Sequence, residues 1–92
     1  MDDKHEQWKQ ILGIEIRRRR TEQSLTLEAL SRLSGVEAAS LSRLERGMRD
    51  PKLSTLVQIA TALRLELPDL FRPDTPDAPV EKAVQGYDLD DE

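Results

Sequence analysis

The chain has 92 residues, of which 14 are basic, 18 are acidic and none is cysteine, and its formal net charge is −4. This length predicts one domain with a modest core, and the absence of cysteine excludes a disulfide framework and a thiolate metal site. No apolar run approaches the roughly 18 residues that a membrane span needs, and the charged start MDDKHEQ is unlike a secretory leader, so we expect a cytoplasmic protein without membrane contact.

The charge is distributed unevenly along the chain. Residues 73–92 hold seven of the 18 acids and one of the 14 bases, so residues 1–72 carry a net charge of +2. The bases also cluster, at 17–20 and again from Arg43 to Lys52. Because the local potential of a surface governs phosphate contact more than the total charge does, the negative net charge is weak evidence against a nucleic-acid partner.

Residues 6–23 predict a first helix, because apolar residues recur every four positions on one face. That face consists of Trp8, Leu12 and Ile16, ends with Arg20, and is widened by Ile11 and Ile14. A second helix is predicted to begin after the N-cap Thr26, with Glu28 in its first turn, and to end at Gly35. Its predicted buried face consists of Leu27, Leu30 and Leu33.

Residues 37–46 predict a third helix, with Leu41 and Leu44 facing the core, Val36 closing the preceding turn and Gly47 as the stop. After a turn at 49–51, a fourth helix is predicted from Leu53 or Ser54 to about Leu63. Pro68 at a helix start, together with Leu67, Leu70 and Phe71, predicts a short fifth helix.

The chain is therefore predicted to be all-α, with a five-helix domain at residues 6–72. Residues 73–92 are acidic and punctuated by prolines, which predicts a flexible polar tail. A weak apolar patch of Val80, Ala83 and Val84 predicts at most one helical turn there.

The segment from Thr26 to Pro51 has the layout of a helix-turn-helix, in which the second helix is presented to the major groove of DNA. The turn requires a residue that tolerates positive φ, and Gly35 supplies it. With Leu41 and Leu44 as anchors, the outward side of helix 37–46 consists of Ala38, Ala39, Ser42, Arg43 and Arg46.

These segments resemble the phage repressor/Cro family of helix-turn-helix regulators, also called the xenobiotic-response-element (XRE) family. The matching text is LGIEIRRRR, LTLEALSRLSGVEAASLSRLERGMRDP and LSTLVQIATALRLELPDLF, which covers about residues 12–71. The resemblance implies a lambda-repressor-like fold, a sequence-specific transcriptional regulator, and residues 37–46 as its recognition helix.

By this resemblance the family's base-reading positions fall on Glu37, Ala38, Ala39 and Arg43, and we add the outward-facing Ser42. Arg43 is the best single candidate, because arginine can pair with both O6 and N7 of guanine; the alternative is that it contacts only phosphate. The two alanines offer apolar contact, for instance to a thymine methyl group, and Glu37 either accepts from cytosine N4 or favours the amino end of the helix.

Phosphate contacts are predicted for Thr26, Ser40, Arg46, Arg49 and Lys52. Thr26 marks a helix amino end, where backbone N–H groups favour an anion, and the last three residues follow the recognition helix, where the DNA backbone would pass. The family usually has glutamine at the position of Leu27, where it contacts phosphate. Leucine lacks that contact, so either the total affinity is lower or Leu27 packs against another residue, such as Trp8.

The resemblance also implies a structural ion pair between Arg20 and Glu45 that locks the first helix to the third. The arginines at 17–19, which belong to the basic cluster, are equally compatible with a solvated helix face that has no further role.

Double-stranded DNA is the leading partner, and a homodimer on a palindrome is expected because one recognition helix reads too few base pairs. The fourth helix and its successor would provide the pairing surface through Leu65, Leu67, Leu70 and Phe71, with core closure as the alternative. An antitoxin or other protein-binding module is the second hypothesis, with the acidic tail either binding a partner, covering the domain's own basic face or only adding solubility. No enzyme, cofactor or metal site is expected, since no convergent nucleophile and base or metal-ligand spacing occurs and the lone His5 is remote.

Overall fold

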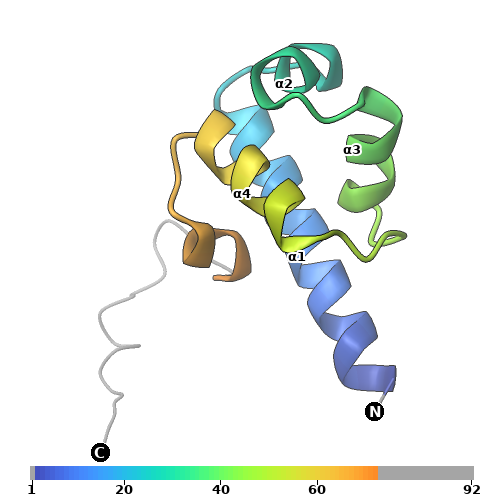
Figure 1. Ribbon diagram of the computed structural model, residues 1–92. Coiled ribbons are helices and arrows are strands. Elements are labelled where there is room, and N and C mark those ends of the chain that lie inside the picture. The colour runs from blue at the N-terminus through green and yellow to red at the C-terminus, as the bar shows by residue number, and fades with distance from the viewer. Residues whose placement is uncertain (1, 73–92) are drawn as a thin grey trace, which may run out of the picture.

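The computed structural model describes residues 2–72, which form four α-helices and one 3-10 helix (Figure 1). The helices are α1 (Asp2–Glu22), α2 (Leu27–Ser34), α3 (Ala38–Glu45) and α4 (Leu53–Ala62), and the 3-10 helix is η1 (Leu67–Phe71). Within this described range no strand occurs. The all-α prediction is confirmed, with one difference: the fifth helix is a single 3-10 segment. The predicted tail at 73–92 lies outside the described residues.

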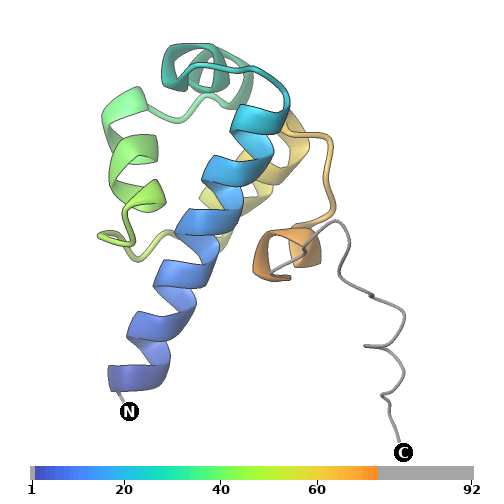
Figure 2. The ribbon, with the colours of Figure 1, turned by 180° about the vertical axis from the view of Figure 1, so that it is seen from behind.

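The long helix α1 is the axis around which the other elements are arranged (Figures 1 and 2). Seen from behind, α3 and η1 flank α1 on opposite sides, while α4 lies on the far side and α2 lies near the carboxyl end of α1 (Figure 2). Contacts join α1 to α3 and η1, α2 to α3 and α4, and α4 to η1. Every element therefore packs against at least two others, which holds α3 between α1 and α2.

The core draws apolar side chains from every element. Its buried members are Leu12 and Ile16 of α1, Leu30 of α2, Val36, Leu41 and Leu44 around α3, Leu56, Ile59 and Ala60 of α4 with its C-cap Leu63, and Leu70 of η1. The predicted anchors of the third helix, Leu41 and Leu44, are among them. Burial of several such side chains, each contributing roughly 1.5–3 kcal/mol, is the main force that fixes the helices relative to one another.

The ends of α2 and α3 are set by local hydrogen bonds. The Thr26 hydroxyl oxygen accepts from the backbone N–H of Ala29 at 3.0 Å, which caps α2. Gly35 then adopts φ +82°, and its N–H donates to the Ser31 carbonyl. Gly47 ends α3 with φ +73°, in a turn where the N–H of Met48 donates to the carbonyl of Arg43. The predicted caps and stops are confirmed at Thr26, Gly35 and Gly47.

The predicted buried face of α2 is wrong at Leu33, whose side chain is 60% exposed. Ser34 is buried in its place. Its hydroxyl accepts from the Val36 N–H, and its carbonyl accepts from the Gln58 side chain of α4. The buried side of α2 therefore follows the spacing i, i+4 from Leu30, because hydrogen bonds let a serine occupy the contact with α4.

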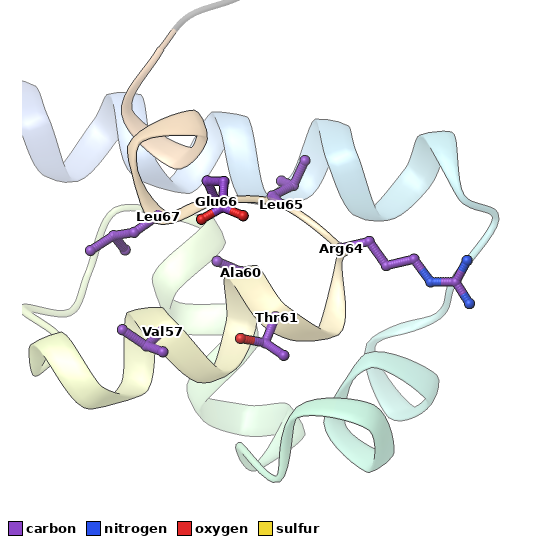
Figure 3. Close-up of a pocket in the computed structure, with 7 residues that line it drawn as sticks. All are labelled: Val57, Ala60, Thr61, Arg64, Leu65, Glu66 and Leu67. Atoms are coloured by element: carbon purple, nitrogen blue, oxygen red, sulfur yellow. The ribbon is translucent and has the colours of Figure 1, made fainter.

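A pocket lies on the outer side of α4, between this helix and the segment that leads to η1 (Figure 3). Its volume is about 540 Å³, and its lining combines Val57, Ala60 and Thr61 of α4 with Arg64, Leu65, Glu66 and Leu67. The pocket gives this side of the domain a concave surface that is partly apolar.

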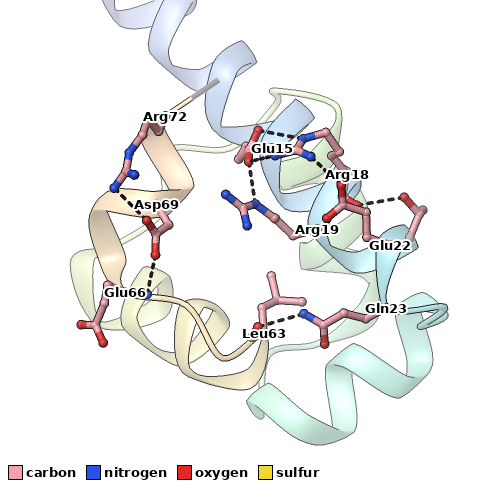
Figure 4. Close-up of polar contacts among 10 residues, drawn as sticks. Glu15, Arg18, Arg19, Glu22, Gln23, Leu63, Glu66, Asp69 and Arg72 are labelled. Carbon is pink, nitrogen blue, oxygen red and sulfur yellow. Dashed lines mark hydrogen bonds and ion pairs between the residues drawn. The ribbon is translucent and has the colours of Figure 1, made fainter. Parts of the chain in front are cut away.

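The carboxyl half of α1 carries an ion-pair network around Glu15, which is only 2% exposed (Figure 4). Its carboxylate accepts from Arg18 at 2.6 Å and from Arg19 at 2.7 Å, and Arg18 also donates to Glu22. Two of the arginines in the run 17–20 therefore neutralise a buried acid, so the alternative of a simply solvated face is wrong for them. Arg17 is exposed.

Among residues 2–72, no helix is long and apolar enough to span a bilayer, and no cluster of three acidic or histidine side chains is arranged to hold a metal ion.

Candidate nucleic-acid interface

Helix α3 has one buried and one open side. Leu41 and Leu44 are buried in the core, whereas Ala39, Arg43 and Arg46 are exposed. These three exposed residues are spaced i, i+4, i+7, so they form one stripe along the helix and its C-cap. Ala38 and Ser42, the other predicted base readers within the helix, are half-exposed beside the stripe. The side of α3 that faces away from the core is therefore accessible along its whole length.

The positive charges of the stripe are not neutralised by neighbours. Within the described part of the chain, the Arg43 side chain makes no hydrogen bond or ion pair. The Arg46 guanidinium donates only to a backbone oxygen, that of Ser42, at 3.3 Å. Unpaired arginines on an exposed helix face attract phosphate and can donate to base edges.

Glu37 precedes the stripe at the N-cap position of α3, where it is exposed. Its side chain makes no capping hydrogen bond. The carboxylate is therefore available to accept from outside the protein, and at the same time its charge favours the amino end of the helix. Both alternatives predicted for Glu37 are compatible with this position.

Three of the predicted phosphate-contacting residues surround one hollow beside α3. Ser40, Arg49 and Lys52 line this hollow, which has a volume of about 330 Å³ and lies between α3 and the amino end of α4. The Arg49 guanidinium donates to the Ser40 hydroxyl at 3.4 Å, and both cations are exposed. The loop after α3 thus presents two cations next to this helix, together with the acid Asp50.

Thr26 lies apart from this hollow, at the amino end of α2, and is exposed. The next residue, Leu27, is half-buried and packs against the core. The proposed partner Trp8 is wrong, because the Trp8 ring packs against Phe71, with ring centroids 6.1 Å apart. α2 lies near the carboxyl end of α1 (Figure 1), whereas Trp8 belongs to the amino half of α1.

The ion pair between Arg20 and Glu45 fixes the carboxyl end of α3 against α1. The guanidinium donates to the two carboxylate oxygens at 2.6 and 3.0 Å and to the Leu25 carbonyl at 2.7 Å. The two side chains are only 12% and 7% exposed. The hydrogen bond to the Glu45 carboxylate, and then its charge, raise the pKa of Arg20 above its ordinary value, although burial opposes this shift.

Gly13 allows the same two helices to approach closely, and it was not singled out from the sequence. A Cβ atom at this buried position would clash with the Leu44 carbonyl oxygen and would lie 2.7 Å from that of Glu45. The α3 backbone therefore lies directly on α1. The available signal is an isolated glycine inside a helical pattern, which often marks a close packing contact.

Comparison with known proteins agrees with this geometry. The helix-turn-helix family model matches residues 16–70. The chain is 43% identical over 54 residues to the HTH-type transcriptional repressor RghR of Bacillus subtilis. The aligned region is 58% of this chain but only 40% of that protein. The chain is also 37% identical over 65 residues to the uncharacterized HTH-type transcriptional regulator y4dJ of Sinorhizobium fredii, covering 71% of this chain and 84% of that protein.

Solved structures with the same fold include two bacterial regulators. The restriction-modification controller protein C.AhdI of Aeromonas hydrophila superposes with a TM-score of 0.67 at 35% identity, over 68% of this chain and 96% of that one. The clp gene regulator ClgR of Corynebacterium glutamicum gives a TM-score of 0.68 at 26% identity, over 85% and 83% of the two chains. Together with the exposed α3, these matches show that the chain belongs to the XRE-type helix-turn-helix family of DNA-binding transcriptional regulators.

Proposed function

We propose that this protein is a sequence-specific regulator that inserts α3 into the major groove of a palindromic operator as a homodimer. The observation that carries the proposal is the open stripe of α3, in which the Arg43 guanidinium is exposed and has no partner within residues 2–72. A structural arginine would be expected to pair with an acid, as Arg20 does with Glu45. An arginine kept unpaired on a rigid helix is suited to an external acceptor.

The roles of the remaining residues follow from their positions. Arg43 would donate to O6 and N7 of guanine, and Ala39 would contact a thymine methyl group. Glu37, Ala38 and Ser42 would complete the base-reading set at the same face of α3. These residues share a single short helix, which is clamped to α1 by an ion pair and a glycine contact, so they would be presented to the groove as one rigid unit.

Phosphate contacts would set the position of α3 in the groove. Ser40, Arg49 and Lys52 surround a single hollow beside α3, and Arg46 continues the exposed stripe. Thr26 would contact a second stretch of backbone through the amino end of α2. Such contacts orient a protein on the duplex without reading its sequence.

A homodimer is proposed because one recognition helix contacts only a few base pairs, and a two-fold pair doubles the site. The outer side of α4 offers an apolar surface for this pairing: Leu53 is 65% exposed and Val57 is 46% exposed. Half-buried Leu65 and Leu67 extend it, and Val57 and Leu67 line the pocket of Figure 3. Leu70 does not belong to this surface, because it is buried in the core.

Phe71 also serves core closure, since it packs edge-on against Trp8.

Because the partner of the protein would be chromosomal DNA, we propose that the protein acts in the cytoplasm of a bacterial cell, as a repressor or other transcriptional regulator.

Selection of bound sequences from a random pool of duplex DNA tests the proposal most directly. A two-fold symmetric consensus, with a guanine at the same place in each half-site, would support base reading by Arg43 and pairing of two copies. An unsymmetrical consensus would contradict the homodimer, and the recovery of no consensus would contradict sequence-specific binding.

A further inference from the structure

A small apolar cavity lies between the amino half of α1, the loop before α4 and η1. Its volume is about 160 Å³, and its apolar walls are Trp8, Leu12, Pro51, Leu56 and Phe71. Lys9 and the paired side chains of His5 and Asp50 also line it. Trp8 and Phe71 meet edge to face, with their ring planes at 67°. The Trp8 side chain nevertheless remains 44% exposed. This cavity lies apart from the stripe of α3, and the proposed function does not use it.

The size and lining of the cavity are suited to one aromatic ring. An apolar cavity of about 150 Å³ is large enough to bind benzene, and a further ring would gain from edge-to-face contact with Trp8 and Phe71. The chain has one tryptophan, one phenylalanine and one tyrosine. Because the first two form the cavity wall, Tyr87 is the only remaining aromatic residue of this chain.

The position of Tyr87 in the sequence allows it to reach the cavity. The described chain leaves η1 at Arg72, directly after Phe71 of the cavity wall. Fourteen residues separate Arg72 from Tyr87, and such a segment spans up to about 46 Å when extended. Val80, Ala83, Val84 and Tyr87 are also spaced i, i+3, i+4, i+7, which is the pattern of an apolar helix face that docks into a groove.

We propose that Tyr87 inserts its ring into this cavity, against Trp8 and Phe71 of the same chain. The four acids that follow Tyr87 are Asp88, Asp90, Asp91 and Glu92. Docking of the ring brings them close to Pro51, which lies in the same loop as Arg49 and Lys52. The acids then compete with DNA phosphate for these cations, and this consequence rests on the proposed DNA-binding function.

Trp8 is the built-in probe for the docking, because it is the only tryptophan of the chain and part of the cavity wall. The experiment measures acrylamide quenching of Trp8 fluorescence in the full-length protein over a range of concentrations. Tyr87→Ala should raise the quenching constant by roughly twofold, because a docked ring covers much of the exposed indole. Tyr87→Phe keeps the ring and should retain the protection, and Thr75→Ala serves as a tail control that should match the parent protein.

An unchanged quenching constant in Tyr87→Ala would overturn the docking. Protection that appears only at high protein concentration would overturn it as well, because a second copy would then cover Trp8. The regulatory consequence is measured separately by titrating duplex DNA at low salt, where Tyr87→Ala should bind several-fold more tightly. If Tyr87→Ala makes Trp8 more accessible but binds DNA no more tightly than the parent protein, only the competition is overturned. If no variant binds DNA, the proposed function is contradicted, and the quenching result alone decides the docking.

Discussion

The ion pair between Arg20 and Glu45 holds α3 in position, so the loss of either side chain should affect this helix. Both side chains are nearly buried, and the guanidinium satisfies both carboxylate oxygens and a backbone carbonyl. Removing one partner of such a pair leaves a buried charge without compensation. We therefore predict that Glu45→Ala lowers the free energy of unfolding by about 3 kcal/mol, as measured by urea denaturation.

A matched control is available on α1. Glu22 also pairs with an arginine, Arg18, but its side chain is 50% exposed, so Glu22→Ala should cost less than about 1 kcal/mol. The double variant Arg20→Ala/Glu45→Ala should lose less than the sum of the single variants. Equal losses for Glu45→Ala and Glu22→Ala would contradict the locking role of the buried pair.

The contact between α1 and α3 also depends on the absence of a side chain at Gly13. Alanine normally favours a helix over glycine by about 1 kcal/mol, but here the added Cβ would meet the backbone carbonyls of Leu44 and Glu45. Because backbone atoms cannot move aside as a flexible side chain can, we predict that Gly13→Ala destabilises the domain by about 2 kcal/mol. Gln7→Ala, at an exposed position of the same helix, should be neutral in the same thermal or urea unfolding. A stabilised Gly13→Ala variant would show that α3 can withdraw from α1 without loss.

The residues that the sequence did not predict share one physical feature: their environment comes from other elements. Leu33 and Ser34 are neighbours in a helix of only eight residues, where periodicity allows either to face the core. Bonds outside the helix favour Ser34: its hydroxyl accepts from the Val36 N–H, and its carbonyl accepts from Gln58 of α4. The role of Gly13 likewise depends on where the α3 backbone lies. By contrast, Thr26, Gly35 and Gly47 act through local hydrogen bonds and backbone dihedral angles, which their residue types already indicate.

At the scale of elements, the order and nature of the helices follow from hydrophobic spacing, while their ends depend on packing. α1 begins at Asp2, four residues before the predicted start, in a stretch without apolar repeats to reveal it. The last element is a 3-10 helix, in which the Glu66 N–H donates to the Asp69 carboxylate and the Asp69 N–H donates to the Glu66 carbonyl. A segment of five residues cannot establish an α-helical repeat, so its helix type was not predictable from spacing.

The proposed insertion of α3 into the major groove can be tested at Arg43. Arg43→Ala should weaken binding to the selected operator by roughly 1–3 kcal/mol and relax base preference at one position in each half-site. The fold should be unaffected, because the side chain is exposed and has no partner in the described chain. Fluorescence anisotropy on the operator and on single-base variants measures both effects, with the unfolding midpoint as the stability check.

Arg32→Ala is the charge-matched control, since Arg32 is an exposed arginine on the neighbouring helix α2. It should change affinity much less and leave base preference intact. If Arg43→Ala lowers affinity equally on every sequence, Arg43 contacts only phosphate. If affinity and preference are both unchanged, Arg43 has no part in binding.

Over the whole molecule, the net charge of −4 conceals two regions of opposite sign. Residues 73–92 hold seven acids, whereas residues 1–72 carry a net charge of +2. Within the described domain, the position of the charges matters more than their sum. Arg18, Arg19 and Arg20 are bound to Glu15 and Glu45, whereas Arg43, Arg49 and Lys52 of α3 and the loop after it form no ion pair within residues 2–72. This distribution was not predictable from the arginine run itself, because the run does not show which of its members an acid neutralises.

The same distribution predicts how DNA binding depends on salt. Each phosphate neutralised by a cation releases counterions, and the slope of log K against log salt is about −0.9 per contact. Arg46, Arg49 and Lys52 are exposed beside α3, so about six phosphate contacts in the proposed dimer predict a slope of about −5. Lys52→Ala should remove two contacts and reduce the slope to about −4 on any duplex sequence. Arg72→Ala, which removes an exposed cation paired with Asp69 on η1, should leave it unchanged. A residue that contacts a base changes how the DNA affinity depends on sequence, whereas a residue that contacts phosphate changes how it depends on salt. A slope unaltered by Lys52→Ala would therefore place the DNA backbone away from the loop after α3.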